Sequence, residues 1–238
     1  MIRRATVTTT RGVEYSKGFS LVKNQRMQIA AVLFPRVTAL DIVGPYEVLQ
    51  RLPGATVTFV GHQRGEIRTE NGFLGLTVDA TFQEISTPDV VIVPGGVGTR
   101  ALMTDETVLN WLRLVHPTTR YTTSVCTGSL LLGAAGLLRG LTATSHWSVL
   151  STLETFGAIP TEDRVVEHLP ERIITAAGVS SGIDMALRLA ELLVDDVAAK
   201  AMQLMVEYDP QPPFDAGSLA KATPDVVARV VEYSKEKS

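Results

Sequence analysis

Short, continuous apolar runs alternate along this chain with longer segments whose apolar residues recur at helical spacing. Such a run, bounded by turn residues, is typical of a strand that is buried on both faces of a parallel sheet. Alternation of strands with helices predicts an α/β fold whose helices cover both faces of the sheet. We therefore expect a flavodoxin-like sandwich with a mostly parallel central sheet. The expected strands are 27–34, 55–61, 89–94, 121–125, 164–168 and 172–176.

The helical pattern covers most of the chain between these strands. We expect helices over residues 40–52, 104–115 and 127–138, and a long one over 181–208 that breaks near Asp195 and Asp196. Thr144 or Ser145 is expected to cap a further helix that runs to Phe156 and ends at Gly157.

Turn signals define the remaining segments. Asn71 and Gly72 predict a hairpin within residues 66–82, because this pair suits a two-residue turn. Residues 209–217 contain three prolines and are predicted to be irregular. Pro224 then occupies the first position of a final helix, where its missing N–H is tolerated.

Length and charge limit the organisation and the partners of the chain. A chain of 238 residues suits one α/β domain, which we expect over residues 27–238, including the proline-rich segment and the last helix. Residues 1–26 are basic and rich in threonine, and we expect them to form a disordered N-terminal extension. The net charge of −3 gives no basic surface for nucleic acid. No apolar run approaches the ~20 residues of a membrane span, so we expect no membrane partner.

Cys126 is the one cysteine of the chain, which excludes an internal disulfide and fits the reducing cytoplasm. It lies between a predicted strand and a predicted helix, flanked by the small residues Ser124, Thr127 and Gly128. This arrangement resembles a nucleophile elbow, in which a sharp turn exposes the reactive side chain. A helix N-terminus should also favour the thiolate. The alternative is an inert, buried cysteine.

Two further segments follow predicted strands and should meet Cys126 at the carboxyl edge of the sheet, where ligands of such folds bind. Asp41 follows the first strand and is interpreted either as a helix N-cap or as an acid/base that faces the thiol. Gly95 and Gly96 follow another strand, where they either present amides to a developing anion or form a turn. The sequence leaves both pairs of alternatives open.

The histidines indicate no metal site. His146 could pair with Cys126, but a capping or packing role is the more usual one. His62, His116 and His168 have no paired ligand spacing, and no phosphate-binding glycine motif is present. We therefore expect neither a metal nor a nucleotide cofactor.

Residues 124–147, which contain SVCTGSLLLGAAGLL and end in SHW, resemble the DJ-1/PfpI superfamily. Within it, residues 27–208 are similar to the isocyanide hydratases and to the sensor domain of AraC-type regulators. The segments 40–45 (LDIVGP), 93–99 (VPGGVGT) and 207–218 (EYDPQPPFDAGS) favour the hydratases. About thirty residues follow Tyr208, and we expect no helix-turn-helix module there.

The resemblance implies a set of site residues. Cys126 would be the nucleophile, Asp41 its acid/base partner and Thr127 the neighbour that shapes the site. Gly95 and Gly96 would supply amide donors, and Gly178 with Val179 would form another wall of the pocket. The family resemblance also implies a homodimer, whereas the contact made by residues 209–214 stays open.

The resemblance also implies a small-molecule substrate: the implied reaction adds water to an isocyanide through a thioimidate on Cys126. The protease-like and glyoxalase-like branches place His or Ala after the cysteine and use a glutamate partner. Thr127 and Asp41 depart from that pattern, which weakens those assignments. The alternatives are another Cys-dependent hydrolase or glyoxalase, and a ligand or redox sensor without turnover. The sequence does not identify the natural isocyanide.

Overall fold

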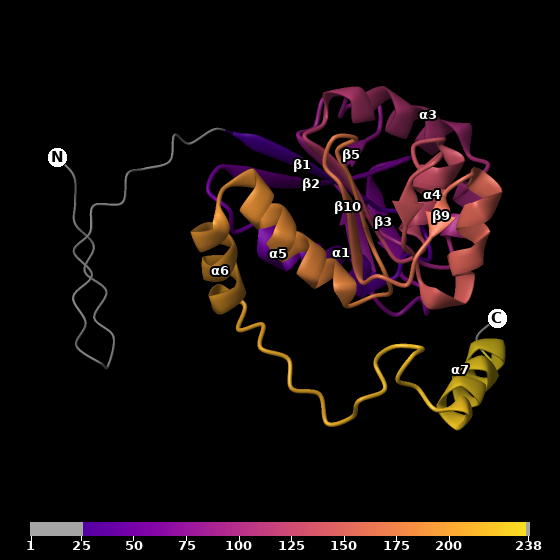
Figure 1. Cartoon of the computed structure of the whole chain (residues 1–238). Coiled ribbons are helices and arrows are strands. Elements are labelled where there is room, and N and C mark those ends of the chain that lie inside the picture. The colour runs from indigo at the N-terminus through magenta and orange to yellow at the C-terminus, as the bar shows by residue number, and fades with distance from the viewer. Residues whose placement is uncertain (1–25, 237–238) are drawn as a thin grey trace, which may run out of the picture.

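A computed structural model describes residues 26–236 and shows a seven-stranded sheet with helices on both faces (Figure 1). The expected disordered extension, residues 1–26, lies outside the described residues except for Arg26. The strands have the order β10-β11-β7-β6-β1-β2-β5. Their bounds are β1 Met27–Val32, β2 Ala55–Gly61, β5 Ala80–Thr81, β6 Val90–Val93, β7 Tyr121–Val125, β10 Val165–His168 and β11 Ile173–Ala176.

The five central strands are parallel and confirm the predicted flavodoxin-like fold. Read in order of appearance in the chain, they lie as second, first, third, fourth and fifth, which is the flavodoxin order. The strand order reverses between β1 and β6, so the loops that follow these two strands flank the place where this fold binds ligands. At the far edge β10 pairs with β11 in the antiparallel direction.

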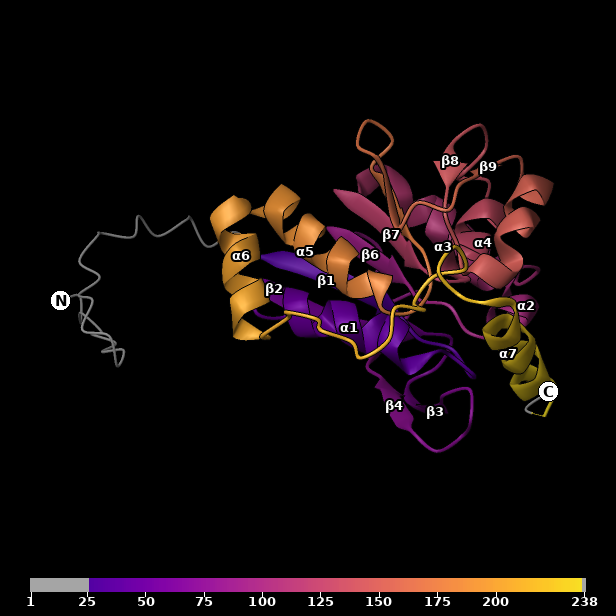
Figure 2. The ribbon, with the colours of Figure 1, turned by 60° about the horizontal axis from the view of Figure 1, so that its bottom comes forward.

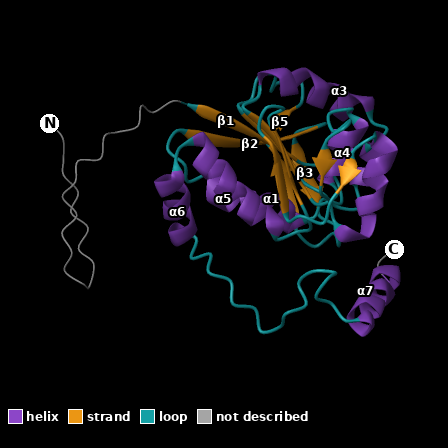
Figure 3. Cartoon of the chain, viewed as in Figure 1, coloured by secondary structure: helices purple, strands orange, loops and turns teal. Residues whose placement is uncertain are grey.

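The helices form two layers, which Figure 3 distinguishes from the strands by colour. α1 (Ala39–Leu49) packs on α5 (Ser181–Leu193), and α5 packs on α6 (Asp196–Met205), along one face of the sheet. The other face carries α3 (Glu106–Val115), α4 (Gly128–Ala134) and the 3₁₀ segment η2 (Trp147–Phe156). The shorter α2 (Thr99–Leu102) and η1 (His116–Thr118) flank α3 in the chain.

The core lies between these layers and the sheet. β6 and β11 are buried at every position, and β1 at all but one. Helices on both faces leave no solvent-facing side of these strands, which explains why their sequences are continuous apolar runs rather than alternating ones.

The predicted hairpin is confirmed as a separate two-stranded unit. β3 (Gly65–Arg68) pairs with β4 (Gly75–Val78), and Gly72 in the connecting turn has φ +75°. A bridge between Thr69 and Val37 joins the hairpin to the loop after β1. Figure 2 shows the hairpin extending from the domain beyond α1. The tip of the hairpin is thereby fixed beside the carboxyl edge of the main sheet.

Two helix predictions need correction. The segment before Gly157 is a 3₁₀ helix, and the side chain of His146, rather than Thr144 or Ser145, caps it by accepting from the amide of Ser148. Gly157 ends the segment in the left-handed conformation, as expected. The helix after Cys126 is shorter than predicted, because the chain turns at Gly136 with φ +83°. β8 (Thr142–Ala143) and β9 (Ile159–Pro160) pair beside it.

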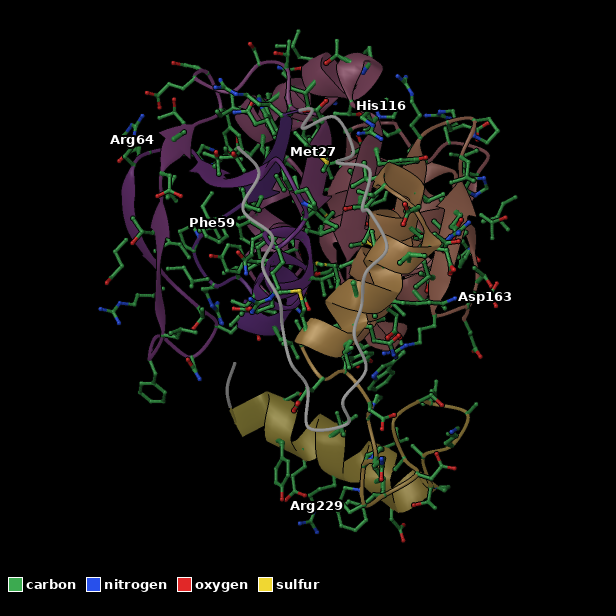
Figure 4. All side chains as sticks on the ribbon, turned by 90° about the vertical axis from the view of Figure 1, so that its left-hand side faces the viewer. Met27, Phe59, Arg64, His116, Asp163 and Arg229 are labelled. Carbon is green, nitrogen blue, oxygen red and sulfur yellow. The ribbon has the colours of Figure 1, made fainter. Side chains whose placement is uncertain are left out.

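The C-terminal part follows the sequence pattern. The long helical segment breaks at Asp195, whose carboxylate accepts from the amide of Ala198 and caps α6. Residues 209–223 are irregular, and α7 (Pro224–Glu236) begins with its proline. In Figure 4 α7, where Arg229 is labelled, lies clear of the domain at the end opposite to Met27 and His116. None of the helices within residues 26–236 combines the length and apolar character that a bilayer crossing requires.

Candidate active site

Cys126 occupies a strained turn between β7 and α4. Its φ of +59° lies in the left-handed region, which a residue other than glycine adopts only when the surrounding structure holds it there. Its amide donates to the carbonyls of Ala176 and Ala177, and its own carbonyl accepts from the hydroxyls of Ser129 and Ser145. These bonds fix the turn from four directions, and the predicted elbow geometry is confirmed.

Gly128 makes the turn sterically possible. A Cβ atom at this position would lie 2.1 Å from the carbonyl oxygen of Val93 on the neighbouring strand β6. The small residue next to the elbow therefore allows α4 to start directly against the sheet.

Asp41 lies in the first turn of α1 and is fully buried. It is not the N-cap, because Thr38 holds that position, so the capping interpretation is wrong. Asp41 Oδ2 accepts from the amide of Gly95 at 2.9 Å, whereas Oδ1 accepts no conventional hydrogen bond within the described residues. The carboxyl group interacts instead with the thiol of Cys126. The elbow and α1 thus place a buried carboxyl beside a buried thiol.

Burial controls the protonation of this pair. It raises the pKa of Asp41 to about 7, although the hydrogen bond from Gly95 and the contact with Cys126 act in the opposite direction. Burial also raises the pKa of the Cys126 thiol, and the charge of Asp41 raises it further. The expected thiolate character is therefore corrected: the amide of Thr127 lowers the thiol pKa, but burial outweighs it. The resting thiol is neutral, with Asp41 positioned to accept its proton.

The backbone amides of Gly95 and Gly96 donate hydrogen bonds to protein side chains. The amide of Gly95 donates to Asp41, and that of Gly96 donates to Thr127 Oγ1 at 2.8 Å. Both amides thereby hold the two site residues, and their expected role as donors to a substrate stays a prediction. Gly96 has φ +131°, and a Cβ there would lie 2.5 Å from the carbonyl oxygen of Arg36, which explains the glycine.

The next two amides of this loop are also engaged. Val97 donates to Glu70 Oε1 at 3.1 Å, and Gly98 donates to the carbonyl of Arg36 at 3.3 Å. The carboxylate of Glu70 also raises the pKa values of Asp41, Cys126 and His146. Sequence reasoning missed Glu70, because only the bridge at the base of the hairpin turn brings it to the site.

Thr127 is held beside Cys126 by its hydroxyl. Its Oγ1 accepts from the Gly96 amide and lies 3.1 Å from Thr99 Oγ1 at the start of α2. Thr127 thereby ties the elbow to the Gly95–Gly98 loop. Its role in shaping a bound substrate stays a prediction.

The predicted wall at Gly178 and Val179 lies in the turn between β11 and α5. A Cβ at Gly178 would lie 2.7 Å from Cδ2 of His146, so the imidazole packs directly against this glycine. His146 Nδ1 lies 2.8 Å from the hydroxyl of Ser148, which agrees with the capping role. Burial lowers the pKa of His146 and keeps the ring neutral near pH 7. The half-buried Val179 stays a predicted wall residue.

A separate cavity of about 320 Å³ lies beside α1, and Cys126 and Asp41 do not line it. Its lining includes Leu40 and Val43 of α1, Ile183 of α5, and Tyr208. Within residues 26–236, no group of three or more His, Cys, Asp or Glu side chains is arranged to hold a metal ion.

Comparisons with known proteins agree with this geometry. The DJ-1/PfpI family pattern matches residues 27–192. An isonitrile hydratase of Pseudomonas putida is 46% identical over 201 residues, which cover 84% of this chain and 87% of that protein. A crystal structure of a ThiJ/PfpI family protein from Pseudomonas syringae superposes with a TM-score of 0.83 at 41% identity, covering 89% of this chain and 87% of that one.

A second kind of relative shares part of the sequence. A helix-turn-helix transcriptional regulator of Pseudomonas aeruginosa is 30% identical over 181 residues. The match covers 73% of this chain but 45% of the regulator, so the chain spans under half the length of that relative.

Proposed function

Because this chain belongs to the DJ-1/PfpI family, we propose that it is an isocyanide hydratase, which adds water to an isocyanide and releases an N-substituted formamide. The observation that carries the proposal is the buried pair of Cys126 and Asp41 at the strained elbow. The 46% identity to an isonitrile hydratase supports the choice of reaction.

In the first step the Cys126 sulfur attacks the terminal carbon of R–N≡C. The thiol proton passes to the Asp41 carboxylate, which then delivers it to that carbon. The product is the thioimidate R–N=CH–S–Cys126. A neutral thiol beside a carboxylate suits this step, since proton removal accompanies attack and no free thiolate has to be maintained in the buried site.

In the second step Asp41 removes a proton from water, which adds to the thioimidate carbon while nitrogen is protonated. The resulting R–NH–CH(OH)–S–Cys126 collapses to R–NH–CHO, and the sulfur recovers its proton. Asp41 serves as base and acid in turn, which requires a carboxyl whose pKa lies near neutrality, and burial provides that pKa.

The direct test measures formamide production from an alkyl and an aryl isocyanide. Wild-type protein should turn over both, and Cys126→Ala should show no turnover while its circular dichroism spectrum stays unchanged. A folded wild type with a reduced thiol and no turnover would contradict the proposal. Methylglyoxal in the same assay distinguishes a glyoxalase, because lactate would then form.

A redox-sensing role has less support. Thiolates, rather than thiols, are oxidised by peroxide, and burial with a neighbouring carboxylate keeps Cys126 protonated. Rapid stoichiometric oxidation of Cys126 in a protein without turnover would favour the sensor instead.

The proposal includes the compartment and the oligomeric state in which the protein works. The reaction needs a reduced Cys126, which the cytoplasm maintains. We also propose a homodimer, in keeping with the family, so light scattering should give about twice the chain mass of 25.7 kDa. A mass of one chain at micromolar concentration would contradict the dimer.

A further inference from the structure

Glu70 reaches the candidate active site from a part of the chain that the mechanism does not use. It lies at the tip of the β3–β4 hairpin, where its backbone amide donates to the carbonyl of Val37 at 3.2 Å. Its side chain accepts from the amide of Val97, one residue beyond Gly96. The hairpin thus places a carboxylate on the loop that holds Thr127 and Asp41.

The charges that act on the site are negative. Asp41 and Glu70 both raise the pKa of Cys126, and Glu70 also raises the pKa values of Asp41 and His146. His146 is neutral near pH 7, so it does not offset them. No lysine or arginine is among the charged groups that shift these three pKa values within the described part of the chain.

Glu70 forms no ion pair with a lysine or arginine among residues 26–236. Its side chain accepts a hydrogen bond from the Val97 amide. The other glutamate of the hairpin, Glu66, pairs with Arg68 at 2.6 Å. Glu70 is exposed to solvent, so its charge lies at the surface beside the Gly95–Gly98 loop. A small cavity of about 100 Å³ has Glu70 in its lining together with Ala39 and Asn71, and Cys126 does not line it.

We propose that Glu70 is a specificity-determining residue, whose unpaired carboxylate on the Gly95–Gly98 loop favours the reaction of neutral electrophiles with Cys126 and disfavours that of anionic ones. A fixed charge near a narrow site changes the local concentration of charged reagents by its electrostatic potential. The proposal rests on the proposed function only in taking Cys126 as the reacting group, and it deepens that function by naming neutral isocyanides as the substrate class.

The test compares alkylation of Cys126 by iodoacetamide, which is neutral, with alkylation by iodoacetate, which is an anion. In both reactions sulfur forms a bond to carbon, iodide leaves, and the thiol proton is lost. With one cysteine in the chain, the mass of the intact protein reports this site alone. The ratio of the two rates cancels any change in thiol pKa, since that change affects both reagents equally.

Glu70→Gln retains an oxygen that can accept from Val97 and removes the charge. We expect the iodoacetate rate relative to iodoacetamide to rise about two- to fivefold in this variant at low ionic strength, and the gain to shrink at ~0.5 M salt, where the Debye length is a few ångströms. Glu70→Asp should restore a low ratio. An equal ratio in wild type and Glu70→Gln would overturn the proposal.

Glu171→Gln is the matched control. Glu171 is an exposed glutamate before β11, at the opposite edge of the sheet, so the net charge changes equally and the ratio should stay at the wild-type value. Should Glu70→Gln fail to fold, Glu70→Asn removes the same charge with a shorter amide and should raise the ratio as well, and an unchanged ratio in that variant would also overturn the proposal. In Glu70→Gln, the turnover rate of isocyanoacetate relative to that of its neutral methyl ester should be higher than in wild type. If the protein is not an isocyanide hydratase, no isocyanide will be turned over, but the alkylation rates will still test the role of Glu70.

Discussion

At the scale of single residues, burial sets the protonation of Asp41 and Cys126. The carboxyl must be ionised to accept the thiol proton, and its pKa is raised to about 7. We therefore expect turnover of a neutral isocyanide to rise with pH through about 7, as Asp41 loses its proton. A rate profile that is flat between pH 5 and 8 would contradict this role of Asp41.

Asp41→Asn tests the same residue without changing its size. The variant retains an oxygen for the Gly95 amide but has no base, so turnover should fall at least ~10²-fold. Steady-state rates on one isocyanide measure the loss. Near-normal turnover in the variant would exclude Asp41 from the proposed steps.

The raised pKa of Asp41 also predicts how stability depends on pH. Its value in the folded protein, about 7, exceeds the ordinary 3.8, so its contribution is full below pH 3.8 and is lost as pH rises through 7. The loss amounts to at most about 4 kcal/mol. Asp41→Asn lacks this term, so its melting temperature relative to wild type should be higher at pH 8 than at pH 5. An equal difference at both pH values would contradict the assigned pKa.

The sequence predicted Cys126, Asp41 and their meeting at one sheet edge, because each follows a recognisable buried strand. It predicted a thiolate at Cys126, whereas burial raises the thiol pKa, and it left open what the Gly95 and Gly96 amides bind. Those amides are occupied by side chains that come from α1 and from the elbow. Such pairings arise only after the strands are assembled.

At the scale of elements, the strand assignments succeeded because both faces of the sheet are covered, which makes the sequences of β1 and β6 almost continuously apolar. The 3₁₀ segment Trp147–Phe156 was predicted as an α-helix. Apolar spacing of three and four residues is common to both helix types, so the pattern does not distinguish them. Its cap, His146, is also outside the set of residues that usually begin helices.

The close approach of α4 to the sheet gives a prediction for Gly128. Gly128→Ala would bring a Cβ atom to 2.1 Å from the Val93 carbonyl, so the elbow must shift. We expect a loss of about 1–3 kcal/mol in the free energy of unfolding, together with a large loss of Cys126 reactivity. Gly217→Ala is the control, since no atom lies within 4 Å of its added Cβ and stability should be unchanged. Equal stability of both variants would refute the steric argument.

At the scale of the whole molecule, the buried core does not extend into the last thirty residues as far as the structure describes them. The buried apolar residues extend from Met27 to Met202, and α7 lies apart from the sheet in Figures 1 and 4. Removal of residues 209–238 should therefore leave the melting temperature within a few degrees of wild type, because little buried surface is lost. Differential scanning calorimetry of the truncated chain at several concentrations is the measurement. A large fall would show that this segment packs on the domain or on a second copy.

The loop Gly95–Gly98 has a consequence for protein engineering. Four consecutive amides each bind a different segment of the chain, so inserting or deleting one residue there would mismatch all of them together. Attempts to widen substrate scope by directed evolution should leave this loop alone and place library diversity at His146 and Val179. Variants diversified at His146 and Val179 should keep the catalytic pair aligned while the accepted side group changes.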